Sequence, residues 1–159
     1  MGINKPVRDS WRAETLAVRG GTRRSEFGET SEAIFATSGY VYEFAEQAED
    51  AFKDLNDRFI YSRFSNPTVD MFQERMALME GAEVGKATAT GMAAVFASMA
   101  CMVEAGDHVV GSRALFGSCL YILKEILPRY GVQTTIVDGT DLSQWEEVLK
   151  RPTKCVFVE

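Results

Sequence analysis

Thr90-Gly91-Met92 lies where a strand is expected to lead into a helix. Because glycine has no Cβ, the backbone at Gly91 can approach a ligand closely. The amides of Gly91 and Met92 would be unpaired donors at the positive end of a helix dipole, which favours an anion such as phosphate. An ordinary tight turn between strand and helix explains the same residues. The sequence contains neither GxGxxG nor GxxxxGK[ST], so it does not support a dinucleotide or P-loop site.

Two other segments carry groups suited to a phosphorylated aromatic ligand. Tyr61 and Arg63 fall in a loop before a helix, where a guanidinium fork and a phenol could bind phosphate. Phe116 follows a strand and precedes a glycine, and its ring could stack on an aromatic cofactor. The alternatives are a surface arginine beside a packing tyrosine, and a phenylalanine in the core.

The remaining chemistry-bearing residues favour structural roles. His108 is the only histidine and opens an expected strand, so it is interpreted as structural, which disfavours a zinc site or a Ser-His-Asp triad. Cys101 is expected to be a small buried residue. With Cys119 and Cys155 it forms no CxxC pair, which fits a reducing cytoplasm.

Helices and strands alternate along most of the chain. The expected helices are 43–56, 67–80, 92–104, 118–129 and 143–150, and the expected strands are 86–88, 108–111, 132–137 and 154–159. This order predicts an α/β fold with a mainly parallel sheet flanked by helices. The sheet is expected to be incomplete, because the last strand reaches Glu159 with no helix after it. In such sheets, ligands bind beyond the carboxyl ends of the strands, where residues 90–92, 115–117 and Glu159 fall.

Caps and apolar stripes define the first helices. Asn66 followed by Pro67 is a helix start, and Gly81 is expected to close that helix in the left-handed conformation. The residues expected to be buried are Val69, Phe72, Met76 and Met79 in this helix, and Phe44, Ala48, Ala51, Phe52 and Leu55 in the helix before it. The small residues of helix 92–104 suggest burial on several sides. Residues 1–42 are interpreted as an extended arm that lies on another part of the protein or on a second subunit.

Composition excludes several classes of protein. The net charge of −6 argues against a broad nucleic-acid surface. No window approaches the roughly 18 consecutive apolar residues of a membrane span, and the N-terminus has no apolar signal-peptide core.

Two blocks together resemble the Cys/Met-metabolism family of pyridoxal-phosphate enzymes, also called trans-sulfuration enzymes. They are Tyr61-Ser62-Arg63-Phe64-Ser65-Asn66-Pro67-Thr68 and Ala87-Thr88-Ala89-Thr90-Gly91-Met92-Ala93-Ala94. The resemblance implies that pyridoxal 5'-phosphate (PLP) is the cofactor. It implies that the amides of Gly91 and Met92 hold the phosphate, that Tyr61 and Arg63 reach it from the neighbouring subunit, and that Phe116 stacks on the pyridine.

The resemblance also implies an architecture. Residues 1–57 would form an arm and helix that make subunit contacts, in a homo-oligomer built as a dimer of dimers. Residues 58–159 would form the first part of the large PLP-binding α/β domain, of the aspartate-aminotransferase-like type. The Schiff-base lysine is expected beyond residue 159 in a Ser-x-Thr-Lys motif, so no catalytic residue is assigned here. The chain's lysines, none of them in such a motif, are Lys5, Lys53, Lys86, Lys124, Lys150 and Lys154.

Within the family, residues 37–42 and 115–119 are most similar to the bacterial branch that converts O-succinylhomoserine and sulfide into homocysteine and succinate. Many relatives have tyrosine in place of Phe116, whose ring can stack but has no hydroxyl. Ser118 stands where methionine γ-lyases typically have cysteine. The alternatives are a cystathionine γ-synthase or γ-lyase, a non-catalytic truncated interaction module, and a generic phosphate-binding α/β domain for nucleotides.

Overall fold

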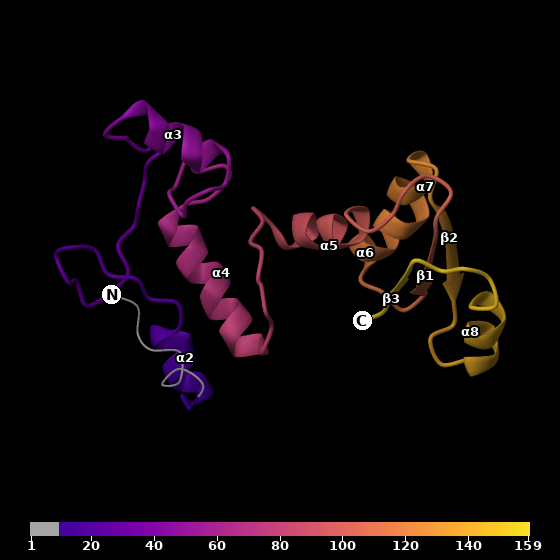
Figure 1. The fold of residues 1–159 in the computed structure, drawn as a ribbon. Coiled ribbons are helices and arrows are strands. Elements are labelled where there is room, and N and C mark those ends of the chain that lie inside the picture. Colours follow the sequence, from indigo (N-terminus) through magenta and orange to yellow (C-terminus); the bar gives the residue numbers. More distant parts are fainter. Residues whose placement is uncertain (1–9) are drawn as a thin grey trace. The chain divides into compact units, whose positions relative to one another are not determined.

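The computed structural model describes residues 10–159, which form two compact units, one ending at Ala87 and one running from Thr88 to Glu159 (Figure 1). Each unit is described by itself. The expected division into 1–57 and 58–159 concerns subunit contacts and cofactor binding, and it stays a prediction.

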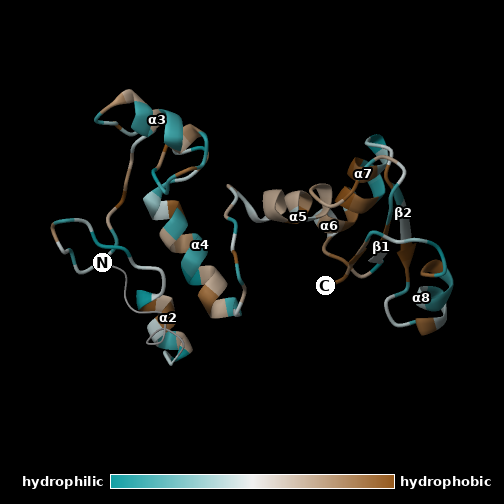
Figure 2. Cartoon of the chain, viewed as in Figure 1, coloured by the Kyte–Doolittle hydropathy of each residue, from teal (hydrophilic) through white to brown (hydrophobic). Residues whose placement is uncertain are grey.

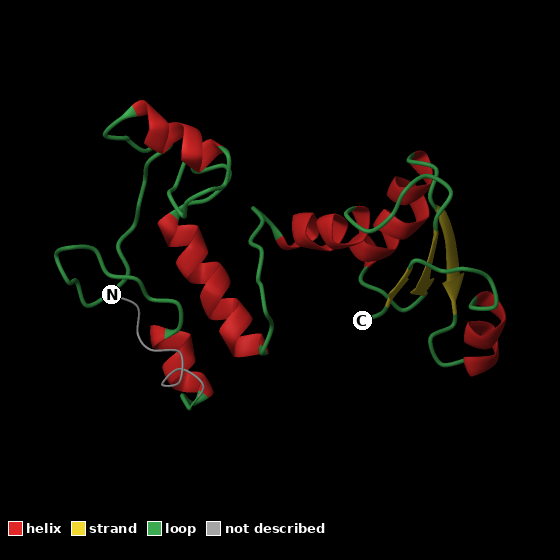
Figure 3. Cartoon of the chain, viewed as in Figure 1, coloured by secondary structure: helices red, strands yellow, loops and turns green. Residues whose placement is uncertain are grey.

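The second unit contains a three-stranded parallel sheet (Figure 3). Its strands are β1 His108–Ser112, β2 Gln133–Val137 and β3 Cys155–Phe157, in the order β2-β1-β3. The central strand β1 is buried along its whole length, as expected for a strand covered on both faces. The α/β prediction is therefore confirmed. The expected strand at 86–88 is wrong, because no segment within residues 10–159 pairs with it in a sheet.

Five helical segments accompany this sheet: α5 Gly91–Ala100, α6 Gly117–Tyr121, η1 Ile122–Ile126, α7 Leu127–Arg129 and α8 Leu142–Val148. The middle three follow one another without a break and correspond to the expected helix 118–129. The π-helical turn η1 precedes Pro128, whose ring lacks an N–H and crowds the carbonyl four residues earlier. Asp141 caps α8 by accepting a hydrogen bond from the Ser143 amide at 2.9 Å.

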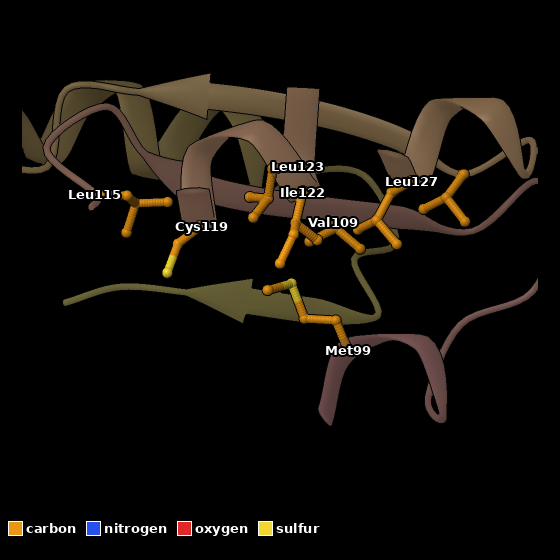
Figure 4. Packing of buried hydrophobic residues seen from close by; sticks show 8 residues of the cluster. Met99, Val109, Leu115, Cys119, Ile122, Leu123 and Leu127 are labelled. Carbon is orange, nitrogen blue, oxygen red and sulfur yellow. The ribbon is translucent and has the colours of Figure 1, made fainter. Parts of the chain in front are cut away.

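The core of the second unit lies between the sheet and the continuous run of α6, η1 and α7, called the long helix below (Figure 4). It is formed by Met99, Val109, Leu115, Cys119, Ile122, Leu123, Leu127 and Val132. Leu123 is 0% exposed and lies so close to β1 that a Cβ on Gly111 would stand 2.3 Å from its Cδ2. Glycine at 111 therefore lets the helix approach the sheet closely.

The expectation that α5 is buried on several sides is wrong. Met99 is its one buried residue, while Ala93, Ala94 and the following Cys101 are exposed. Small apolar residues permit close packing but do not create a neighbour. Within the part of the chain that the structure describes, only one face of α5 meets the core.

His108 is structural, as predicted. Its ring is buried, with Nδ1 3.0 Å from Thr153 Oγ1 and Nε2 2.9 Å from Thr135 Oγ1. Burial lowers the pKa of His108 from its ordinary value of 6.5, and the nearby Arg151 lowers it further. The neutral ring is therefore the form that the folded chain favours.

This environment predicts a pH dependence of stability. Above about pH 6.5 the imidazole is neutral whether the chain is folded or unfolded, and its contribution is fully present. As the pH falls through 6.5, the unfolded chain binds a proton that the folded chain resists, so the free energy of unfolding decreases until the pH passes below the folded pKa. Urea unfolding between pH 5 and 7.5 measures this slope, and His108→Gln should remove it. An unchanged slope in the variant would assign it to another group.

The first unit contains α2 Ala13–Arg19, α3 Ala45–Phe52 and α4 Pro67–Glu80. The expectation of an extended arm at 1–42 is wrong for the part that the structure describes, since α2 lies within it and packs on α4; residues 1–9 lie outside the described residues. Gly21 has a positive φ of 70°, and a Cβ there would stand 2.6 Å from the Met71 carbonyl oxygen. The caps of α4 are confirmed: Asn66 is the N-cap, Pro67 follows it, and Gly81 is left-handed with a φ of 63°.

The apolar stripes expected to be buried in this unit are largely exposed. Figure 2 shows hydrophobic residues of α4 interspersed with hydrophilic ones. On α4 the buried residues are Met71 and Ala77, whereas Val69, Phe72, Met76 and Met79 are open to solvent. The helix expected at 43–56 is shorter than predicted, and only Ala51 of its stripe is buried. Periodicity identifies an apolar face but not its partner, and within residues 10–87 of the first unit nothing covers these faces. None of the described helices is long and apolar enough to cross a bilayer.

Candidate functional site

The N-terminus of α5 presents two free amides. Thr90 is the N-cap: its Oγ1 accepts from the Ala93 amide at 3.1 Å, and its carbonyl accepts from the Ala94 amide at 3.1 Å. Among residues 10–159, no acceptor is bonded to the amides of Gly91 or Met92. A Cβ added at Gly91 would meet nothing within 4 Å, so the approach is open. Two donors at the positive end of a helix can together bind an anion.

Phe116 follows the carboxyl end of β1 and is 65% exposed. The core-packing alternative for this residue is therefore wrong within the described chain. Phe116 is also the N-cap of α6, and its amide donates a hydrogen bond to Glu159 Oε2 at 2.6 Å. The ring is left free to contact a flat ligand.

The buried thiol of Cys119 also acts on the Glu159 carboxylate. The thiol and the Phe116 amide together lower the pKa of Glu159. The same interaction, followed by burial, raises the pKa of the Cys119 thiol. Cys119 had no role among the predictions made from the sequence. The sequence did hold one signal for its position near Glu159: neighbouring parallel strands bring the residues that follow β1 and β3 to the same edge of the sheet.

Tyr61 and Arg63 lie together on the exposed loop before α4. The Arg63 guanidinium carbon is 5.2 Å from the centre of the Tyr61 ring and 5.1 Å from that of Phe64. Tyr61 pairs with Gly39 in an isolated antiparallel bridge. The loop can therefore offer a cation and a phenol together, but this local geometry equally suits a surface arginine over aromatic rings.

The arm is fastened to this loop by Ser62 and Asn66. The Ser62 hydroxyl donates to the Thr37 carbonyl at 2.5 Å, and its amide donates to the Ser38 carbonyl at 2.9 Å. The buried Asn66 donates from Nδ2 to the Phe35 carbonyl and to Ser62 Oγ, both at 2.9 Å. Its Oδ1 accepts from the Thr68 amide at 2.9 Å. One side chain thus caps α4 and holds the arm, which lies on another part of the protein here.

Asn66→Ala is expected to lower the free energy of unfolding by about 1–3 kcal/mol, because it removes a cap and leaves buried partners unpaired. Asn66→Ser keeps a capping oxygen but not the amide donors, and should lose about half as much. Asn56→Ala, which removes only an exposed turn bond to the Arg58 amide, should change it by less than about 0.5 kcal/mol. Urea denaturation measures all three, and equal effects at both asparagines would contradict the dual role.

The five residues expected to bind a cofactor fall into the two units. Tyr61 and Arg63 share one loop in the first unit, and Gly91, Met92 and Phe116 belong to the second. Each local arrangement suits the role expected of it. That all five residues bind one ligand stays a prediction.

Comparison with known proteins gives the chain relatives named as sulfhydrylases and as L-methionine gamma-lyases. It is 54% identical over 155 residues to an O-succinylhomoserine sulfhydrylase of Mycobacterium tuberculosis, covering 98% of this chain and 38% of the relative. It is 44% identical over 146 residues to the enzyme of the same name from Pseudomonas aeruginosa, covering 92% of this chain and 36% of the relative. The chain thus spans little more than a third of the length of these relatives.

Solved structures share the fold of this chain. A crystal structure assigned as an O-acetylhomoserine (thiol)-lyase from Campylobacter jejuni, which contains an N'-pyridoxyl-lysine-5'-monophosphate, superimposes with a TM-score of 0.87 at 32% identity. The match covers 93% of this chain and 36% of that one. The family described as Cys/Met metabolism PLP-dependent enzyme matches residues 14–159. Since the family matches nearly the whole chain, the chain belongs to this family of PLP-dependent enzymes.

Proposed function

We propose that the full-length protein is a PLP-dependent transferase of methionine biosynthesis that exchanges the succinyloxy group of O-succinylhomoserine for sulfide, giving homocysteine and succinate. The observation that carries the proposal is the 54% identity to an O-succinylhomoserine sulfhydrylase across 98% of this chain. The second sulfhydrylase relative, at 44% identity, supports the same reaction.

The residues of this chain fit the cofactor that the family implies. The free amides of Gly91 and Met92 would bind the phosphate, and the exposed ring of Phe116 would stack on the pyridine. Tyr61 and Arg63 would reach the phosphate from a neighbouring subunit. When bound, PLP supplies an electron sink that stabilises negative charge on substrate carbons. This chain's share is then to hold and orient the cofactor.

Because the cofactor would be bound by residues from two subunits, the proposal implies a homo-oligomer. Two subunits would share the site, and two such dimers would form a tetramer. The apolar face of α4, which nothing within residues 10–87 covers, supports an association of this kind. Free Cys101, Cys119 and Cys155 fit a cytoplasmic enzyme.

Product analysis of the purified full-length protein tests the reaction. O-succinylhomoserine with sulfide should yield homocysteine and succinate, and O-acetylhomoserine should be the poorer substrate. Cystathionine formed faster from cysteine than homocysteine is from sulfide would indicate cystathionine γ-synthase instead. Release of a 2-oxo acid and ammonia without a thiol acceptor would indicate a γ-lyase.

A further inference from the structure

The carboxylate of Glu159 connects two segments that are far apart in the sequence. It accepts a hydrogen bond from the Phe116 amide at 2.6 Å. β1 and β3 are parallel neighbours, with Gly111 opposite Phe157, so the chain leaves both strands at the same edge. Glu159 and the loop before α6 therefore meet directly beyond that edge.

This contact replaces a missing helix cap. Phe116 is the N-cap of α6, but its side chain cannot accept a hydrogen bond from the first turn. In a capping box, a carboxylate at the third helical position reaches back to the N-cap amide. Here Cys119 holds that position, and Glu159 supplies the carboxylate from another strand. Its negative charge lies near the positive end of the helix, which is the favourable polarity.

We propose that Glu159 is a positioning residue that fixes the backbone of Phe116, so that its ring is held ready to stack on the cofactor. The inference rests on the proposed function for the role of the ring, but the contact itself is independent of it. Cys119, the third residue of α6, is buried in the core between helix and sheet. The Phe116 side chain is exposed, so the backbone contact with Glu159 leaves it open to a ligand.

Hydrogen exchange of the full-length protein, with and without PLP, tests the contact. In Glu159→Ala, exchange in the peptide containing residues 114–121 should quicken by about tenfold, because the Phe116 amide loses a charge-assisted bond. Glu159→Gln retains an acceptor oxygen and should restore most of the protection. Cys119→Ala keeps the Phe116 bond and should change exchange by much less. Unchanged exchange in Glu159→Ala would overturn the proposal.

The cofactor link has its own readout. The dissociation constant for PLP should rise several-fold in Glu159→Ala and return toward the original value in Glu159→Gln. An unchanged constant in Glu159→Ala, in a protein where Phe116→Ala weakens binding, would overturn positioning by Glu159. If Phe116→Ala itself leaves PLP affinity unchanged, the stacking role is wrong and the positioning proposal falls with it, whatever sulfhydrylase activity remains.

Discussion

Replacing Arg63 with alanine in the full-length protein should weaken PLP binding by about 10- to 100-fold, because a charge-assisted bond to the phosphate is lost. The guanidinium lies on the exposed loop beside the Tyr61 ring and has little else to stabilise in the described chain. Equilibrium dialysis of the apoprotein against PLP, followed by cofactor absorbance, measures the change.

Two variants make this result specific. Arg63→Lys retains the charge but not the planar fork, so its affinity should fall between those of the original protein and Arg63→Ala. Arg58→Ala removes an exposed arginine from the same loop and should leave the affinity unchanged. Equal losses at positions 58 and 63 would indicate a general charge effect. No loss at 63 would remove Arg63 from the phosphate site.

Leu123→Ala should lower the free energy of unfolding by about 2–5 kcal/mol, since it truncates a side chain that is 0% exposed. Leu123 packs against Gly111 of the central strand and within the cluster that joins the long helix to the sheet. The cavity left by the truncation would weaken the packing between the helix and the sheet, which together position Phe116 and Glu159. Urea denaturation followed by tryptophan fluorescence measures the loss.

Leu142 provides the matched control. Its side chain is 74% exposed at the start of α8, so Leu142→Ala should change the free energy of unfolding by less than about 0.5 kcal/mol. Similar losses at 123 and 142 would mean that the core is not where the structure has it.

Local signals in the sequence were sufficient for much of the fold. Asn66 and Gly81 bound α4 because capping depends only on neighbouring backbone groups. The parallel sheet followed from the alternation of helices and strands. His108 was recognised as structural because the sequence offered no partner for catalysis or metal binding, and its threonine partners then came from β2 and the turn before β3.

Features that depend on distant contacts were less predictable. The apolar stripe containing Phe72 and Met76 was identified, but which face of α4 is covered depends on α2, a helix that the sequence analysis did not anticipate. Residues 86–88 have strand-like composition and no neighbour to pair with. Phe116 and Glu159 were both placed beyond the sheet edge, but the bond between them needs the register of β1 and β3.

The central claim concerns where the cofactor phosphate is held. It is tested most directly by a crystal structure of the full-length protein with PLP bound. We expect phosphate oxygens within hydrogen-bond distance of the Gly91 and Met92 amides, and the Tyr61 and Arg63 side chains of a neighbouring subunit on the same phosphate. A phosphate bound elsewhere, with protein side chains occupying the N-terminus of α5, would contradict this account.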